Sequence, residues 1–533
     1  MQTIVTAIFD EYNKAKSYKD ALGEKGLSQQ SKINERFYSG NQWYGVTGGN
    51  DRPLVRHNII KRIGDFKISQ TLSNQYVVGF FAEGEDIEKD DISSYKELKD
   101  KAKKKDFVFK GKVSESEISA VCRALSGHFK HTAERIDIKS LSTRVLKEAY
   151  LRGAGVLYTF FDSANSFGTD FEGERVSGDI KCEVLNINDV YFADGTLTCL
   201  QEQPYIILAS MKRKDEILEL AREYGTIGMI ERTEPDENGK ILVLTKLYKE
   251  RTENGESVKC IMVTEKGVLR PAFDTRLHLY PLSVFCFGDA ENTAYGESEV
   301  TYLIPNQIAI NRMITASVWS NIAAGMPMML VNGDTVSGDI SNDPGQIIKI
   351  YGTNEDVSSA VKFVSPPDYS SGLNEAVNNL IYNTLTQSGA SPTILGDEQA
   401  QNASAIEMLQ NAALIPLDIL KSRYRSFLRE TALIWLDFWL NLYLKRKLKI
   451  EDEDGIWYFP FDAARYSGLR ISVSMHEFEE HKFTIKEKIA ILGELFDRGV
   501  ITAKEYIARL PESIIDSRAN LAENIKEKNN ATE

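Results

Sequence analysis

Three long helical patterns follow Tyr295, and they constrain the fold of this chain more than any other feature. Residues 297–325 carry apolar side chains at the three-to-four spacing of a helix. A second pattern covers about 368–388. A third begins near 402 and continues to about 445, with Pro416 inside it, where a kink is expected. Helices of this kind bury their apolar stripes against neighbours, so we expect packing between copies of the chain.

Two insertions separate these helices. Residues 326–366 form a short β-like module that closes with Ser-Pro-Pro. Residues 388–409, SGASPTILGDEQAQNASAIEML, are typical of a helix end, a loop of small and polar residues, and a helix start. Loops between packed helices usually have about 2–8 residues. The longer loop at this place is therefore a candidate functional segment.

Acidic residues dominate this part of the chain. Between Arg312 and Lys421 there are two basic residues, Lys349 and Lys362, and eleven acidic ones, which gives a net charge of −9 out of −13 for all 533 residues. One explanation is chance together with a partner of opposite charge. The other is a surface that must not bind a polyanion, along which DNA could slide because no counterion release would hold its phosphates.

The rest of the chain is mixed. Residues 1–80 are predicted to be mainly helical around a loop at 38–53, and residues 115–150 are helical again. Residues 152–290 contain β-branched and aromatic runs with one helix near 214–225, which indicates an α+β region rather than a βαβ repeat. A β-like patch, LRISVSMHEF, precedes a C-terminal helical hairpin. The charged stretch 83–112 is interpreted as a solvated helix face or loop.

Composition points to a folded protein of the cytoplasm. The five cysteines, Cys122, Cys182, Cys199, Cys260 and Cys286, form no CxxC pair, so we expect buried, reduced thiols. The N-terminus has acids at Asp10 and Glu11 and no secretory core. The most apolar run, ALIWLDFWLNLYL, is too short to span a membrane and contains Asp437. We expect Trp435, Phe438 and Trp439 to pack within the subunit or against a neighbour.

Motifs for catalysis are missing from the sequence. No Gly-Lys-Ser/Thr phosphate loop occurs, and LRGAGV at 151–156 is better explained as a tight turn into a strand. His476 and His481 are five residues apart, whereas a helical zinc site of the HExxH kind needs a spacing of four. We therefore expect no enzyme, no metal and no cofactor. A metallohydrolase using His476, His481 and nearby acids is the weakest alternative.

The order of these features resembles the portal proteins of tailed bacteriophages, also called head-to-tail connectors. The resemblance rests on ERFYSGNQW at Glu35–Trp43, RPLVRHNII at Arg52–Ile60, EAYLRGAGVLY at Glu148–Tyr158, YGESEVTYLIPNQIAINRMITA at Tyr295–Ala316, and SGASPTILGDEQAQNASAIEMLQ at Ser388–Gln410. The last segment is the most specific match. Residues 160–290 and the C-terminus do not align with the family.

This resemblance implies an elongated α+β subunit that assembles into a ring. The implied parts are a β-containing wing (1–296), a first stem helix (297–325), a small clip (326–366), a second stem helix (367–389), a tunnel loop (390–402), a long kinked helix with returning wing strands (403–480), and a crown-like helical hairpin with a tail (481–533).

The implied function is a channel at one capsid vertex for DNA packaging and ejection. The implied partners are eleven further copies in a twelve-membered ring, double-stranded DNA, the terminase large subunit, the major capsid and scaffolding proteins, and a head-tail adaptor, with no membrane. The implied location is the virion, after assembly in the host cytoplasm. A different virion ring or adaptor protein is the nearer alternative.

The implied site has two parts. The channel or tunnel-loop residues are Ser391, Thr393, Asp397, Glu398, Gln399, Gln401 and Asn402. The clip residues expected to contact the terminase or adaptor are Asn332, Asp334, Asp339, Asn342 and Asp343.

Overall fold

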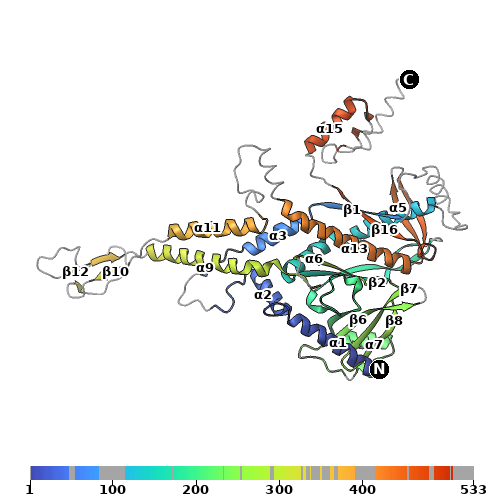
Figure 1. Ribbon diagram of the computed structural model, residues 1–533, viewed down its shortest axis with the longest axis horizontal. Coiled ribbons are helices and arrows are strands. Elements are labelled where there is room, and N and C mark those ends of the chain that lie inside the picture. Colours follow the sequence, from blue (N-terminus) through green and yellow to red (C-terminus); the bar gives the residue numbers. More distant parts are fainter. Residues whose placement is uncertain are drawn as a thin grey trace. The chain divides into compact units, whose positions relative to one another are not determined.

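The computed structural model describes a mixed α+β protein (Figure 1). The described residues are 2–46, 54–82, 115–170, 173–231, 233–252, 255–288, 293–325, 328–331, 336–337, 349–350, 361–364, 370–390, 414–452, 455–478, 485–503, 506–507 and 510. Their contacts form two compact units. One contains residues 1–72 and 78–474, and the other contains residues 73–77 and 475–533.

The predicted N-terminal helices are confirmed. They are α1 (Gln2–Asp20), α2 (Leu27–Ser39) and α3 (Ile59–Thr71), followed later by α5 (Glu115–Ile136) and α6 (Ile138–Arg152). Asp137 separates the last two because its backbone has a left-handed φ of 55°, which an uninterrupted helix does not allow. Its carboxylate then accepts a hydrogen bond from the Ser140 backbone N–H at 3.3 Å and caps α6.

Two antiparallel sheets fill the predicted β region. The five-stranded sheet has the order β4 (Val190–Phe192), β5 (Tyr205–Arg213), β6 (Lys240–Thr252), β7 (Gly255–Thr264), β8 (Gly267–Asp274). The three-stranded sheet has the order β3 (Arg175–Leu185), β2 (Ala154–Thr169), β9 (Leu282–Cys286). The predicted single helix is present as α7 (Lys214–Glu223), next to the short α8 (Ile227–Ile230).

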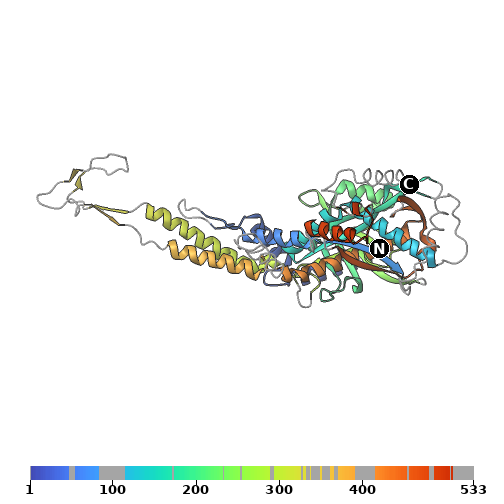
Figure 2. The same ribbon diagram turned by 90° about the horizontal axis from the view of Figure 1, so that it is seen from above.

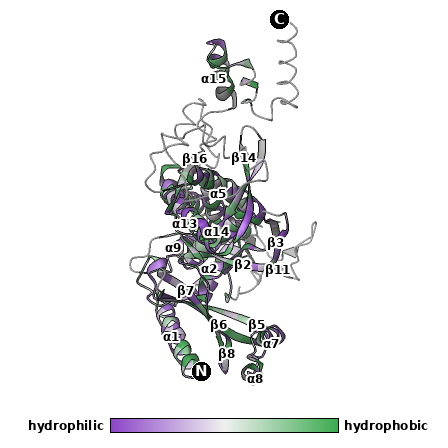
Figure 3. Cartoon of the chain, turned by 90° about the vertical axis from the view of Figure 1, so that its right-hand side faces the viewer, coloured by the Kyte–Doolittle hydropathy of each residue, from purple (hydrophilic) through white to green (hydrophobic). Residues whose placement is uncertain are grey.

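Helix α1 covers the five-stranded sheet. Val5, Ile8, Tyr12 and Ala15 recur at helical spacing and pack with buried residues of β4 to β8 such as Ile207. Figure 3 shows hydrophilic and hydrophobic residues along the same helix, as expected for a helix with one buried face. The first residues of the chain are therefore part of the core of this sheet.

The predicted turn at LRGAGV is confirmed. Gly153 ends α6 with a φ of 97°, and a Cβ there would lie 2.7 Å from the Gly296 carbonyl oxygen. Gly296 has a φ of 62° and approaches Gly153 equally closely. Only glycine fits two backbones this near to each other, so this contact fixes where the chain enters α9 (Glu299–Gly325).

The third helical pattern differs from its expected bounds. Residues 403–413 lie outside the described residues. Pro416 forms a 3₁₀ turn, η3 (Ile415–Leu417), and α13 runs from Asp418 to Leu442 rather than to 445. Leu444 follows with a φ of 46° and turns the chain into β14 (Lys445–Asp452). Trp435 and Trp439 are 0% exposed, so the aromatic run packs within the subunit, as one of the two expectations had it.

The remaining elements are short. β14 pairs with β15 (Gly455–Asp462), and α14 (Ala463–Tyr466) leads to β16 (Ile471–Phe478), which pairs with β1 (Gln75–Ala82). In the second unit, α15 (Ile485–Asp497) forms the first helix of the expected hairpin and ends before Gly499, whose φ is 68°. Among the described residues, no helix is both long and apolar enough to cross a membrane.

The cysteine prediction is correct only in part. All five thiols are free, and Cys122 and Cys260 are buried. Cys199, however, is exposed, and Cys182 and Cys286 are half-buried. Cys199 lies in an irregular stretch immediately before the 3₁₀ turn η2 (Leu200–Glu202), where no sheet or helix covers it.

Candidate channel hairpin

Helices α9 and α11 (Ser370–Gln387) form an antiparallel hairpin and lie side by side in both views (Figures 1 and 2). Two hydrogen bonds define their direction. The Asn306 amide donates to the Thr384 hydroxyl at 3.2 Å, and the Ser317 hydroxyl donates to the Asn374 side-chain oxygen at 2.7 Å. Helices are therefore present at both places where the sequence pattern predicts them, and they pack on each other.

Charged side chains are nearly absent from this hairpin. The 27 residues of α9 and the 18 residues of α11 contain only Glu299, Arg312 and Glu375, whereas 26% of the whole chain is charged. A solvated surface normally carries charges of both signs. A hairpin this poor in charge is suited to contact with other protein surfaces or to passage of a polyanion without retention.

Polar side chains of α9 hold the segment that leads into α3. Asn311 accepts a hydrogen bond from the His57 N–H at 3.0 Å, Gln307 accepts one from the Ile59 N–H at 3.0 Å, and Thr315 accepts one from the Val55 N–H at 3.1 Å. The three side chains are four residues apart and so share one helix face. They accept hydrogen bonds from alternate backbone N–H groups of residues 55–59, and we call them the amide ladder.

Residues of the N-terminal motifs complete this anchor. Gln42 accepts a hydrogen bond from the Asn311 amide at 2.6 Å, and Trp43 donates to the Val55 carbonyl at 3.0 Å. Arg56 donates to the Gly40 carbonyl at 2.9 Å, and the Asn58 side chain caps α3 by accepting from the Lys61 N–H at 3.1 Å. The residues of the two N-terminal motifs thus form the surface against which α9 packs. Their spacing in the sequence did not reveal this role.

An ion pair fixes the first turn of α9. Lys67 on α3 lies 2.6 Å from the Glu299 carboxylate, and both side chains are largely buried. Burial raises the pKa of Glu299, an effect that Lys67 opposes. The carboxylate also lies in the first turn of the helix, where the helix dipole favours negative charge.

The chain leaves the hairpin and returns to it at one place. After α11, Gly389 has a φ of 77°, and Ala390 is buried and donates its N–H to the Leu385 carbonyl at 3.0 Å. A Cβ at Gly389 would lie 3.7 Å from the Pro416 Cβ, which is van der Waals contact. The two ends of the connection between residues 390 and 414 therefore meet.

A cavity of about 360 Å³ lies beside this meeting point. It is lined by residues of α3, α9, η3 and α13, among them Tyr302, Pro416, Ile419 and Arg423. Arg423 donates to the Phe287 carbonyl at 2.5 Å, which joins α13 to the chain that follows β9. These contacts hold the base of the connection in place.

The predicted site residues are not brought together by the described structure. All seven tunnel-loop residues, from Ser391 to Asn402, lie outside the described residues. The clip residues Asn332, Asp334, Asp339, Asn342 and Asp343 lie outside them too. Of the clip module, the structure describes two antiparallel strand pairs, β10 (Met328–Val331) with β13 (Val361–Val364), and β11 (Val336–Ser337) with β12 (Lys349–Ile350).

The hairpin and its base carry large apolar side chains in contact with solvent. Tyr302 is 65% exposed, Tyr382 is 50% exposed, and Ile415 and Ile419 are each 64% exposed. Trp319 and Ile322, further along α9, are also exposed.

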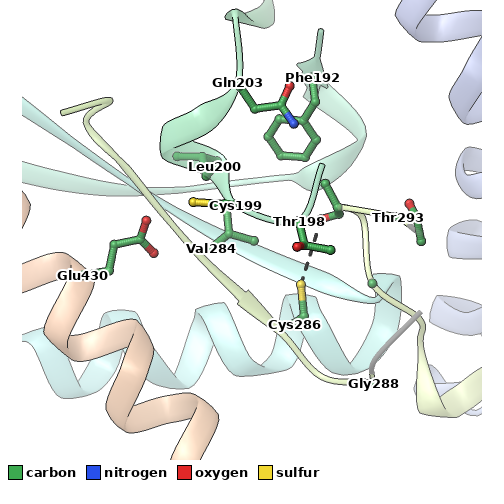
Figure 4. Close-up of a pocket in the computed structure, with 12 residues that line it drawn as sticks. Phe192, Thr198, Cys199, Leu200, Gln203, Val284, Cys286, Gly288, Thr293 and Glu430 are labelled. Atoms are coloured by element: carbon green, nitrogen blue, oxygen red, sulfur yellow. Dashed lines mark hydrogen bonds between the residues drawn. The ribbon is translucent and has the colours of Figure 1, made fainter. Parts of the chain in front are cut away.

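A second cavity, of about 310 Å³, is lined by side chains from three parts of the chain (Figure 4). Glu430 comes from α13, Cys199 from the stretch before η2, and Cys286 from the end of β9. Burial raises the pKa of Glu430 to about 7, although hydrogen bonds from Gln201 and the Val284 N–H oppose the shift. The carboxyl group therefore keeps its proton to a higher pH than an exposed glutamate does.

No metal centre is found among the described residues, where no three histidine, cysteine, aspartate or glutamate side chains gather. His476 lies on strand β16, and His481 lies outside the described residues. The metallohydrolase alternative has no support from this geometry.

No protein-family model matches the sequence, and no curated protein matches it. Among solved structures, the chain is similar to a chain from a virion of a native gene transfer agent particle. The TM-score is 0.36 at 9% identity, over 93% of this chain and 98% of that one. It is also similar to a chain from the neck of an empty gene transfer agent particle, with a TM-score of 0.33 at 12% identity, over 87% and 94%. Both TM-scores are low, so the functional proposal rests on the residues of this chain.

Proposed function

We propose that this chain is the subunit of a portal-type ring, through which double-stranded DNA enters a phage-like capsid and leaves it. The observation that carries the proposal is the charge-poor antiparallel hairpin of α9 and α11, with a small β module between its helices and a connection whose ends meet at its base. This is the order of parts that the sequence resemblance implies.

Two further features support a ring. The amide ladder and the Lys67–Glu299 pair attach α9 firmly to the rest of its unit, as a wall that must hold its position requires. The exposed apolar side chains of the hairpin, such as Tyr302 and Tyr382, would be covered by the hairpins of neighbouring copies. The wall so formed would offer few cations to phosphate groups, and DNA would pass without being held.

The other parts of the proposal follow from this role. Residues 390–402 would act as the tunnel loop, residues 326–366 as the clip that receives the terminase or adaptor, and residues 481–533 as a crown. The ring would be built in the host cytoplasm and kept in the virion. The subunit would supply no chemistry of its own, and a separate motor would drive the DNA.

Single-particle imaging of the purified protein, combined with mass photometry, tests the proposal. We expect rings of about twelve 60.0 kDa subunits around a hole wide enough for a DNA duplex. A protein that stays monomeric or dimeric at micromolar concentration, both alone and when produced together with its capsid protein, would contradict a portal role.

A further inference from the structure

A row of basic side chains lies on one face of α13. Lys421, Arg425 and Arg429 are spaced four residues apart, so they share a face of the helix. Arg425 and Arg429 are exposed and Lys421 is half-buried. None of the three forms an ion pair with any residue that the structure describes. We call these three residues the basic stripe.

The basic stripe does not help α13 to form. Lys421 lies in the first turn of the helix, where the helix dipole disfavours positive charge. Like charges four residues apart also repel each other along a helix. The adjacent acid, Glu430, lines the Cys199–Cys286 cavity and does not pair with the stripe. Unneutralised charge that weakens its own helix points to an anionic partner.

Helix α7 carries a row of the opposite sign. Asp215, Glu219 and Glu223 are also four residues apart, and all three are exposed. They too lack an ion-pair partner within the described parts of the chain, whereas the neighbouring Glu216 binds Arg213 at 3.0 Å. We call these three residues the acidic stripe.

We propose that the basic stripe of one copy docks on the acidic stripe of a neighbouring copy. Four residues of helix span about 6 Å, so two helices lying side by side place each cation opposite a carboxylate in a single register. The contact joins two different patches, and contacts of this heterologous kind form a ring when the rotation between successive copies closes. The inference therefore rests on the proposed ring and names one of its subunit contacts.

DNA is the competing occupant of the basic stripe. Two observations favour a second copy instead. The chain carries a net charge of −13, which opposes the approach of a polyanion. It also carries a matching acidic row with the same spacing on another helix. The experiment below includes DNA binding as an outcome.

Charge reversal tests the contact. One variant carries Lys421→Glu, Arg425→Glu and Arg429→Glu, and the other carries Asp215→Lys, Glu219→Lys and Glu223→Lys. Each variant alone should need a roughly tenfold or higher concentration to assemble, because like charges then face each other. An equimolar mixture should assemble as the wild type does, because every contact in an alternating assembly is again between opposite charges.

A control variant separates this effect from net charge. Lys61→Glu, Lys139→Glu and Arg144→Glu change the charge equally at exposed positions of α3 and α6, and assembly should be unchanged. The midpoint of assembly is read by mass photometry over a dilution series. An equal loss of assembly in the control variant would overturn the contact. Failure of the two charge-reversal variants to assemble when mixed would also overturn it.

The same series distinguishes the contact from the ring. Rings that form in the wild type and in both variants alike would leave the proposed function standing and reject the contact. A wild-type dimer that is lost in each variant and regained in the mixture would support the contact and reject the ring. Absence of any association would reject both. Loss of binding to a short DNA duplex in the Lys421 variant, with assembly intact, would assign the basic stripe to DNA and overturn the contact.

Discussion

Burial is the main cause of the raised pKa of Glu430. Among the described groups that shift this pKa there is no cation. The pKa lies near 7, above the usual 4.5, so the folded protein binds this proton more tightly than the unfolded chain does. The stabilisation of the folded state by this bound proton is complete below about pH 4.5. It is lost as the pH rises through about 7. The raised pKa of Glu430 is thus a consequence of its packing in the cavity and does not by itself indicate catalysis.

We expect Glu430→Gln to stabilise the protein at pH 8, by roughly 1–3 kcal/mol, and to change little at pH 4.5. The amide keeps the size of the side chain but never carries the buried charge. Urea unfolding of the variant and the wild type at both pH values measures the difference. Glu24→Gln, at an exposed position, serves as the control and should show no dependence. An equal effect of Glu430→Gln at both pH values would contradict this account.

At the scale of elements, the amide ladder makes α9 the hydrogen-bonding partner of the segment that leads into α3. Val55, His57 and Ile59 donate their N–H groups to side chains of a helix. Those side chains are more than two hundred residues away in sequence, so no local pattern could pair them. A buried amide on α9 could be recognised from sequence, but its partner could not.

Asn311→Ala should weaken this attachment by about 1–3 kcal/mol for each buried group left without a partner. The buried group is the Gln42 side-chain oxygen, and the partly buried His57 N–H loses its partner as well. Hydrogen exchange at the amides of residues 55–59 is the sensitive measurement, and their protection should fall. Asn378→Ala, at an exposed position of α11, should leave this protection unchanged. Unaltered protection in the Asn311 variant would show that the ladder is not what holds this segment.

Helices were easier to predict than strands in this chain. The periodicity of 299–325 and 370–387 located α9 and α11 to within a few residues, because long apolar stripes have one interpretation. The residue pattern did not locate the β14–β15 pair, since KRKLKIED reads as a charged surface, and apart from the LRISVSMHEF patch, strands within 403–480 were expected only from the resemblance. Arg446 is nonetheless buried, because its guanidinium donates to the Gly178 carbonyl at 2.6 Å and lies over the Tyr443 ring. Arg446 occupies a position on the buried face of β14, where an apolar residue is usual. The alternation of apolar and polar residues that marks a strand is therefore hard to recognise in the sequence.

At the scale of the whole molecule, charge is distributed unevenly. The hairpin has almost none, the segment between Arg312 and Lys421 is strongly acidic, and cations begin again at the basic stripe. The sequence shows this distribution directly. It does not show which charges face an axis, because that depends on the copies around it.

The tunnel-loop assignment predicts the effect of reversing charge in the channel. Asp397→Lys with Glu398→Lys should slow DNA packaging, because each lysine would offer an electrostatic contact to phosphate. Ring assembly should be unaffected. The rate of DNA uptake into capsids carrying the variant measures this. Glu24→Lys with Glu231→Lys, both at exposed positions away from the hairpin, provides a control with the same charge. Normal packaging by the Asp397 variant would refute an electrostatically slippery loop.

The meeting of Gly389 and Pro416 has an evolutionary consequence. A segment whose two ends start and finish at one point can gain or lose residues without moving the helices that carry it. Doubling the length of such a segment costs only about 0.6 kcal/mol in closure entropy. The closure entropy therefore sets little restriction on the number of residues between these two positions, while the amide ladder and the glycine contact at Gly153 and Gly296 depend on exact side chains. Adaptation to a new genome or a new motor could proceed in that one segment, leaving the scaffold as it was.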